Sequence, residues 1–374
     1  MRIRDVQLTP FAIPFRRPVA TARGGITLRE GVVVRLVADD GTEGVGEAAP
    51  HPHAAPEALA LMRAKLIDAA VLLRGADLAQ AEEVLDAAGA LGGAAAMGLD
   101  MALHDLVARL RDVPLARLLG GGCVPVAVSA LLDGDVVAAA HAASAAGFRS
   151  AKLKAALDPD ATATTVADVV RAAPGLRLRI DANGAWSLEQ TVRAMRTLDS
   201  AHVEWIEQPL PADDLDALAD ARSRARDLGH RVAADECVRG PDDVRRIAAH
   251  GAADVVVVKL VQTGGLRRAV ATVDAAHAAG LAAVVTTGLE TSLGTAAALH
   301  LASALAARGG AEPLAAGIAT ADLLARDLVA EPIASAPVMT PPPGPGLGVA
   351  PGRRTPDATL RVVDEHGASH GGIA

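Results

Sequence analysis

SAKLK (150–154) is the first of five short, largely apolar runs that each end in an ionisable residue. The others are LRLRID (176–181), VEWIE (203–207), VAAD (232–235) and VVVVK (255–259). Their last residues follow one another at intervals of 27, 26, 28 and 24 positions. One strand, one helix and two loops of a (β/α)8-type barrel take about this length, since about 250 residues form the whole barrel. The spacing therefore predicts parallel strand–helix units whose strand ends converge on one site.

Outside these runs, the pattern divides the chain of 374 residues into two domains. The β-branched runs Val124–Ala130 and Ala282–Thr287 extend the alternation, so we assign residues 123–334 to the barrel. Residues 1–122 read as strands followed by helices, with a turn at 39–41, which indicates an α+β domain. The Pro- and Gly-rich segment at about 335–374 is expected to pack back on that first domain.

Composition and charge exclude several classes of protein. Aromatic residues make up 1% of the chain and its net charge is -8, so we expect no nucleic-acid partner. The two cysteines, Cys123 and Cys237, have no metal-binding or disulfide spacing. Neither a signal peptide nor a long uncharged apolar stretch is evident, which predicts a cytoplasmic enzyme with no membrane contact. Self-association into a homo-oligomer stays open.

Three carboxylates, Asp181, Glu207 and Asp235, come from three successive predicted strands. Oxygen ligands alone suit a hard cation, which favours Mg²⁺, with Mn²⁺ as a substitute. No His or Cys ends these strands, which disfavours zinc. The alternative is that each acid caps the helix that follows it.

Three lysines also lie at or near the ends of predicted barrel strands. Lys152 and Lys154 share one face of their strand, because strand side chains alternate. Repulsion and partial burial should lower the pKa of both, which suits a general base. Lys259 follows four valines and should face the barrel mouth from the opposite side. Two lysines that straddle a carboxylate bound to a cation can remove the proton on its α-carbon and stabilise the enediolate.

Taken in order, these motifs resemble the muconate-lactonizing subgroup of the enolase superfamily. The match includes Gly44–Pro50, Leu99–Leu106, Leu118–Gly121, Lys152-Leu153-Lys154, Asp181–Gly184, Glu207-Gln208-Pro209, Ala234-Asp235-Glu236 and Lys259. The resemblance implies an α+β capping domain over a (β/α)7β barrel. It also implies Mg²⁺ on Asp181, Glu207 and Asp235, with Lys154 and Lys259 as the acid/base pair. Lys152 would tune Lys154, and Asn183 would support the site.

Shorter matches bear on the substrate, a small carboxylate. The dipeptide epimerases usually carry Asp-x-Asp on the last barrel strand, whereas this chain has Gly317–Leu324 without it. That segment, Thr21–Gly24 and Arg29-Glu30-Gly31 look like those of the o-succinylbenzoate synthases. The resemblance implies a hydro-lyase that performs a syn dehydration in menaquinone biosynthesis. Racemases of N-acylamino acids, dipeptide epimerases, muconate-type cycloisomerases and a non-catalytic binding barrel remain alternatives.

Substrate recognition is expected from the capping loop and from the last two barrel strands. The candidate residues are Arg23, Asn183, Gly288, Glu290, Ser292 and Ile318. Ser292 is equally a candidate for the N-cap of the helix that follows it.

Overall fold

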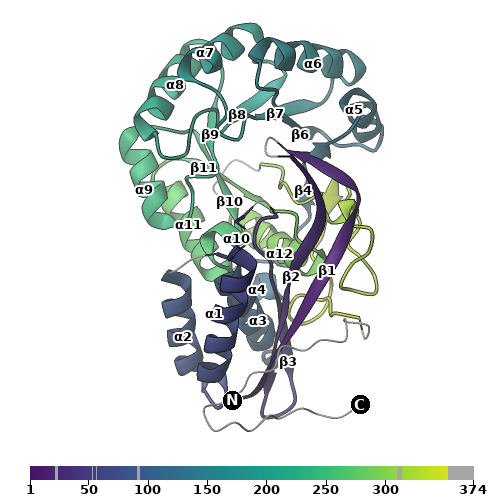
Figure 1. Cartoon of the computed structure of the whole chain (residues 1–374), viewed down its shortest axis with the longest axis vertical. Helices are drawn as coiled ribbons and strands as arrows, with labels where there is room; N and C mark the ends of the chain where they lie inside the picture. The colour runs from purple at the N-terminus through teal and green to yellow at the C-terminus, as the bar shows by residue number, and fades with distance from the viewer. Residues whose placement is uncertain (22–23, 53, 56, 91–92, 310–313, 353–374) are drawn as a thin grey trace.

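A computed structural model of the protein describes residues 1–21, 24–52, 54–55, 57–90, 93–309 and 314–352. Figure 1 shows an antiparallel sheet with helices at one end of the molecule and a curled parallel sheet, ringed by helices, at the other. This arrangement confirms the predicted α+β capping domain with a TIM-like barrel.

The capping domain is built on a long hairpin. Its sheet has the order β1-β2-β3, with both pairs antiparallel. The strands are β1 (Ile3–Thr21), β2 (Gly24–Ala38) and β3 (Glu43–Ala48), and the helices are α1 (Glu57–Leu73), α2 (Leu78–Ala90), α3 (Gly93–Leu110) and α4 (Leu115–Leu118). Gly46 allows β3 to lie directly against α3, since a Cβ there would stand 2.1 Å from the carbonyl oxygen of Gly98. This close packing explains the glycines of the Gly44-Val45-Gly46 motif.

Seven parallel strands form the barrel sheet, in the order of the chain from β5 to β11. They are β5 (Ala130–Leu132), β6 (Ser150–Lys154), β7 (Arg177–Asp181), β8 (Val203–Glu207), β9 (Val232–Ala234), β10 (Val255–Lys259) and β11 (Ala282–Thr286). The helices are α5 (Val136–Ala145), α6 (Pro159–Ala172), α7 (Leu188–Thr197), α8 (Leu215–Asp227), α9 (Pro241–His250), α10 (Leu260–Thr263), α11 (Leu266–Ala278) and α12 (Ser292–Arg308). Most side chains on both faces of these strands are buried, which is why the runs are largely apolar.

An eighth extended segment, Ala316 and Gly317, closes the barrel. The amide of Gly317 donates to the carbonyl of Val285 at 2.9 Å, and that of Thr287 donates to Gly317 at 3.0 Å. On the other side, the amide of Ser129 donates to Ala316 at 2.9 Å. Both bridges are parallel, so the architecture is the expected (β/α)7β barrel.

The first barrel strand begins later than predicted. The run Val124–Ala130 divides: β4 (Val126–Ala127) pairs antiparallel with β12 (Val338–Met339), Val128 forms the isolated parallel bridge to Ala316, and β5 of the parallel sheet starts only at Ala130. An apolar run does not specify its partner, and the contact with a strand near the end of the chain decided the pairing. A short 3-10 helix, η1 (Ala321–Leu323), follows the eighth segment.

Buried carboxylates join the capping domain to the barrel helices. Asp100 of α3 accepts from the amide of Leu266 at 2.5 Å, where α11 begins. Glu47 of β3 accepts from the amides of Thr291 and Gly294 at 3.1 Å each, where α12 begins. Anions stabilise helix N-termini, so these contacts fix the ends of two barrel helices against the cap.

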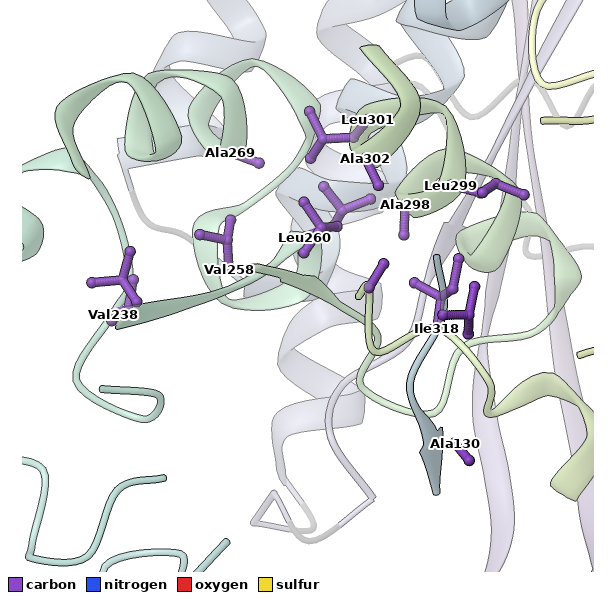
Figure 2. Packing of buried hydrophobic residues seen from close by; sticks show 14 of the residues in the cluster. Ala130, Val238, Val258, Leu260, Ala269, Ala298, Leu299, Leu301, Ala302 and Ile318 are labelled. Atoms are coloured by element: carbon purple, nitrogen blue, oxygen red, sulfur yellow. The ribbon is translucent and has the colours of Figure 1, made fainter. Parts of the chain in front are cut away.

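Most buried apolar side chains belong to one large core that runs through the barrel and its helices. Figure 2 shows part of it, including Val258 of β10, Leu260 of α10, Leu299 of α12 and Ile318. Among the residues described, no helix combines the length and the apolarity needed to cross a membrane.

Candidate active site

The three predicted ligand carboxylates lie side by side at one mouth of the barrel. Asp181 and Glu207 end β7 and β8 as paired residues, and Asp235 directly follows β9. Each is at most 2% exposed. Parallel strands of similar length bring their carboxyl ends to the same edge, so three sequence-distant acids meet there.

Lysine ammonium groups contact all three carboxylates. Lys152 Nζ lies 2.7 Å from Asp181 Oδ2 and 2.5 Å from Glu207 Oε1. Lys259 Nζ lies 2.7 and 2.5 Å from the two oxygens of Asp235. These charged pairs offset part of the cost of burying three acids together.

Uncharged donors, an indole N–H and several amides, orient the same carboxylates. Trp205 Nε1 donates to Glu207 Oε2 at 3.2 Å, and Gln262 Nε2 donates to Asp235 Oδ1 at 3.3 Å. Asn183 donates from its backbone to Asp181 Oδ1 at 3.0 Å and from its side chain to Asp181 Oδ2 at 3.2 Å. The backbone of Asn183 has φ 47°, a left-handed conformation that asparagine tolerates better than most residues.

Lys154 is the lysine whose environment suits a base. Its Nζ donates to Asn183 Oδ1 at 2.7 Å and lies 3.8 Å from Asp181 Oδ2. Burial lowers the pKa of Lys154, and the charges of Lys152 and Lys259 add to this effect, while Asp181 opposes it. The lowered pKa agrees with the sequence prediction for this residue.

The same prediction was wrong for Lys152. Burial alone would lower the pKa of Lys152, but Asp181, Glu207 and Asp235 together raise it well above its usual value. Burial also disfavours the charged form of Lys259, yet Asp235 outweighs it and the pKa of Lys259 is raised. From the sequence, only Lys154 could be identified as a neighbour of Lys152, and a like charge nearby lowers the pKa of a lysine. The three carboxylates that raise the pKa of Lys152 become its neighbours only in the folded barrel.

A cavity of about 600 Å³ lies over these residues, between barrel and cap. Lys152, Lys154, Asp181, Asn183, Glu207 and Lys259 line it from the barrel side. Lys154 on β6 and Lys259 on β10 approach from either side of β7, β8 and β9. A ligand held at the carboxylates therefore has a lysine on each flank.

The predicted substrate-binding residues divide into two groups. Asn183 and Gly288 line the cavity. Glu290, Ser292 and Ile318 are buried and are not among the residues that line it. Arg23 lies outside the described residues.

Each of the three buried residues has another role in the fold. Glu290 accepts from the amide of Gly288. Ser292 Oγ donates to Asp327 Oδ2 at 2.8 Å and accepts from the amide of Ile333 at 2.9 Å, and the N-cap of α12 is Thr291. Ile318 belongs to the apolar core (Figure 2). As placed, these side chains do not reach a ligand in the cavity.

Sequence reasoning missed Arg179 and Trp205, which stand two residues before Asp181 and Glu207. Arg179 is 2% exposed, lines the cavity and lies 4.1 Å over the Trp205 ring. Its Nε bonds Glu204 Oε2 at 2.6 Å, and the strand register shifts between Leu178 and Arg179 where β7 meets β8. The period of two along a strand could have signalled both residues, because they share a face with the acids.

The donor set at the barrel mouth fits a magnesium ion in its chemistry: three buried carboxylates from adjacent strands, with no soft ligand among them. Among the described residues, however, no group of three acidic, His or Cys side chains is placed to hold one ion. In this structure the ammonium groups of Lys152 and Lys259 contact oxygens of all three carboxylates.

Comparisons with known proteins agree with this geometry. Residues 3–120 match the family model of the mandelate racemase / muconate lactonizing enzyme N-terminal domain, and residues 135–355 match that of the enolase C-terminal domain-like family. The o-succinylbenzoate synthase of Thermobifida fusca is 34% identical over 95% of this chain and 90% of its own. The N-succinyl-L-Arg/Lys racemase of Bacillus cereus is 27% identical over 75% of this chain and 78% of its own. A dipeptide epimerase of Enterococcus faecalis, solved with Mg and L-Leu-L-Tyr, superposes with TM-score 0.86 at 26% identity over 94% of this chain and 100% of its own.

Proposed function

Because this chain belongs to the mandelate racemase / muconate lactonizing enzyme family of the enolase superfamily, we propose that it removes the proton α to the carboxylate of its substrate and then expels the neighbouring hydroxyl as water, which yields o-succinylbenzoate. The observation that carries the proposal is the placement of Lys154 and Lys259, which line one cavity, on opposite flanks of three strands that end in buried carboxylates. A substrate carboxylate at that mouth places its α-carbon between the two lysines.

Lys154 is the base in this proposal. Its lowered pKa raises the fraction of free amine near neutral pH, and Asn183 holds its Nζ at 2.7 Å. Lys154 takes the α-proton and then returns a proton to the departing hydroxyl on the same face. One lysine thus serves both halves of a syn elimination, and water leaves as the ring becomes aromatic.

Lys259 supplies positive charge from the opposite flank. Its raised pKa keeps it protonated at neutral pH, so it stabilises the negative charge that develops on the substrate carboxylate. We propose that Asp181, Glu207 and Asp235 bind Mg²⁺, for which Mn²⁺ can substitute. When bound, the ion supplies further positive charge to the carboxylate oxygens of the substrate.

The residues that line the cavity favour a succinyl-substituted carboxylate over a dipeptide as the substrate. Apart from the acids at the barrel mouth and Glu236, the described lining contains no carboxylate. Gly317 of the last strand segment, with Ala319 and Thr320 of the turn that follows, lines the cavity in the region where the epimerases usually carry acids. A free ammonium group on the substrate would therefore lack a counter-charge there.

A racemase of N-acylamino acids is the second candidate. The flanking lysines that support dehydration also permit removal of a proton on one face and its return on the other. The N-succinyl-L-Arg/Lys racemase among the relatives supports N-acylated amino acids as the substrates of this second candidate function.

The test is turnover of 2-succinyl-6-hydroxy-2,4-cyclohexadiene-1-carboxylate, followed as loss of the diene absorbance with Mg²⁺. We expect efficient conversion that EDTA abolishes, that excess Mg²⁺ or Mn²⁺ restores, and that Lys154→Ala lacks. No conversion by the folded, metal-loaded wild type refutes the dehydratase. Exchange of solvent deuterium into N-succinylamino acids by the same sample would then favour the racemase.

A further inference from the structure

One face of helix α1 forms the wall of the cavity on the cap side. Ala58, Leu61, Met62 and Lys65 line the cavity, and their intervals of three, one and three positions place them on a single helical face. Lys65 is half-buried. Within the described part of the chain, Lys65 forms no ion pair and no hydrogen bond. A cation thus stands without a partner at the end of an apolar wall.

The distribution of lysine sets Lys65 apart from a chance surface residue. The chain has 36 basic residues, of which only four are lysines, and all four line this cavity. Three of them are the lysines at the barrel mouth. Among the described arginines, Arg179 alone lines the cavity. Elsewhere the chain therefore carries its positive charge on arginine, and Lys65 shares its residue type and its location with the reacting groups.

Helix α3, which is in contact with α1, adds a second positive feature to the same cavity. Gly93, Ala94 and Ala95, the first turn of α3, also line the cavity. The first amide groups of a helix have no acceptor within it and form the positive end of its dipole. The first turn of α3 contains no acidic residue, and none of the described cap residues that line the cavity is acidic.

We propose that Lys65, with the first turn of α3, binds a second carboxylate of the substrate, while the first carboxylate occupies the barrel mouth. The substrate is then a dianion whose carboxylates lie at opposite ends of an apolar wall, as a succinyl side chain provides. This inference rests on the proposed function for the first carboxylate and assigns the distal group. Of the residues predicted to recognise the substrate, Glu290 and Ser292 are buried, and this proposal assigns the distal carboxylate to the cap helices in their place.

The test compares two ligands that differ only in the distal carboxylate: o-succinylbenzoate and 2-butanoylbenzoate, measured by calorimetry with Mg²⁺ present. We expect Lys65→Met to weaken o-succinylbenzoate about tenfold or more, the loss typical of one hydrogen bond to a charged group. Binding of 2-butanoylbenzoate should not change. Lys65→Arg, which keeps the charge, should restore most of the affinity, and Arg63→Met is the matched control, since Arg63 lies on α1 but does not line the cavity.

The outcomes separate this proposal from the proposed function. Equal affinity of the wild type for the two ligands, including no binding of either, overturns the subsite. So does a Lys65→Met variant that binds o-succinylbenzoate as the wild type does, or that weakens both ligands equally. If the ligand contrast holds but the diene precursor is not converted, the subsite stands and the dehydratase fails. If the diene precursor is converted but the two ligands bind equally well, the dehydratase stands and the subsite fails.

Discussion

A fall in pH should destabilise the protein by protonating His300, whose hydrogen bonds join the barrel to the cap and to the C-terminal segment. His300 is fully buried on α12, where its Nδ1 accepts from the amide of Ala116 at 3.2 Å and its Nε2 lies 3.2 Å from the carbonyl of Leu347. Nε2 therefore carries the proton, and Nδ1 cannot take a second one without losing Ala116. Burial accordingly lowers the pKa of His300 from 6.5 to about 4.

The sign and size of the effect follow from proton linkage. The unfolded chain binds a proton at this position below pH 6.5, whereas the folded chain does so only near pH 4. The stabilisation is therefore present at pH 7 and is lost as the pH falls. With about 1.36 kcal/mol per pKa unit, His300 alone should lower the free energy of unfolding by about 3 kcal/mol between pH 7 and pH 4.

Urea unfolding at both pH values measures this loss. Trp186 and Trp205, the only tryptophans, are buried in the barrel and report unfolding by fluorescence. His300→Gln should be less stable than the wild type at pH 7, and the difference should shrink by about 3 kcal/mol at pH 4. Exposed His277 provides the control, because His277→Gln should follow the wild type at both pH values. A His300→Gln variant that loses stability in parallel with the wild type would refute the reasoning.

Four further outcomes are expected. Lys154→Ala should reduce turnover by about a hundred- to ten-thousandfold, as removal of a general base does, with the fold intact by circular dichroism; residual activity near that of the wild type would exclude it as the base. Asn183→Ala should lower kcat by about 10- to 100-fold and shift the pH–rate profile, because Lys154 loses its acceptor; an unchanged profile would contradict that role. Burial raises the pKa of Glu47 to about 7, so its contribution to stability is full below pH 4.5 and is lost as the pH rises through 7; unfolding titrations should show this loss in the wild type and not in Glu47→Gln. Ser292→Ala should cost about 1–3 kcal/mol in unfolding experiments, since Asp327 loses a donor, while KM stays unchanged; a raised KM would return Ser292 to the substrate site.

The barrel mouth could be predicted from the sequence because its residues obey local rules. Buried parallel strands are largely apolar, so the acid that ends each short run could be recognised at a regular interval along the chain, as Asp181 and Glu207 were. The two-residue period fixes the common face of Lys152 and Lys154 without any knowledge of the fold. The spacing between such strand ends then determines the repeating unit, and with it the barrel.

Contacts between distant segments could not be predicted in this way. Ser292 follows a strand as an active-site residue would, yet Asp327 and Ile333, more than thirty residues away, enclose it. The pKa of Lys152 depends on carboxylates from three other strands. Lys65 has no motif around it, and only the docking of α1 over the barrel places it in the cavity.

The sequence by itself determined the five strands that carry the site, their order and the chemical groups at their ends, because burial and side-chain alternation act along the chain. The tertiary structure alone decided which of those groups face the cavity, which lysine is the weaker base, and which cap residues complete the pocket. The physical reason is that desolvation and charge act through space, so each pKa and each ligand contact is set by neighbours that the sequence does not place.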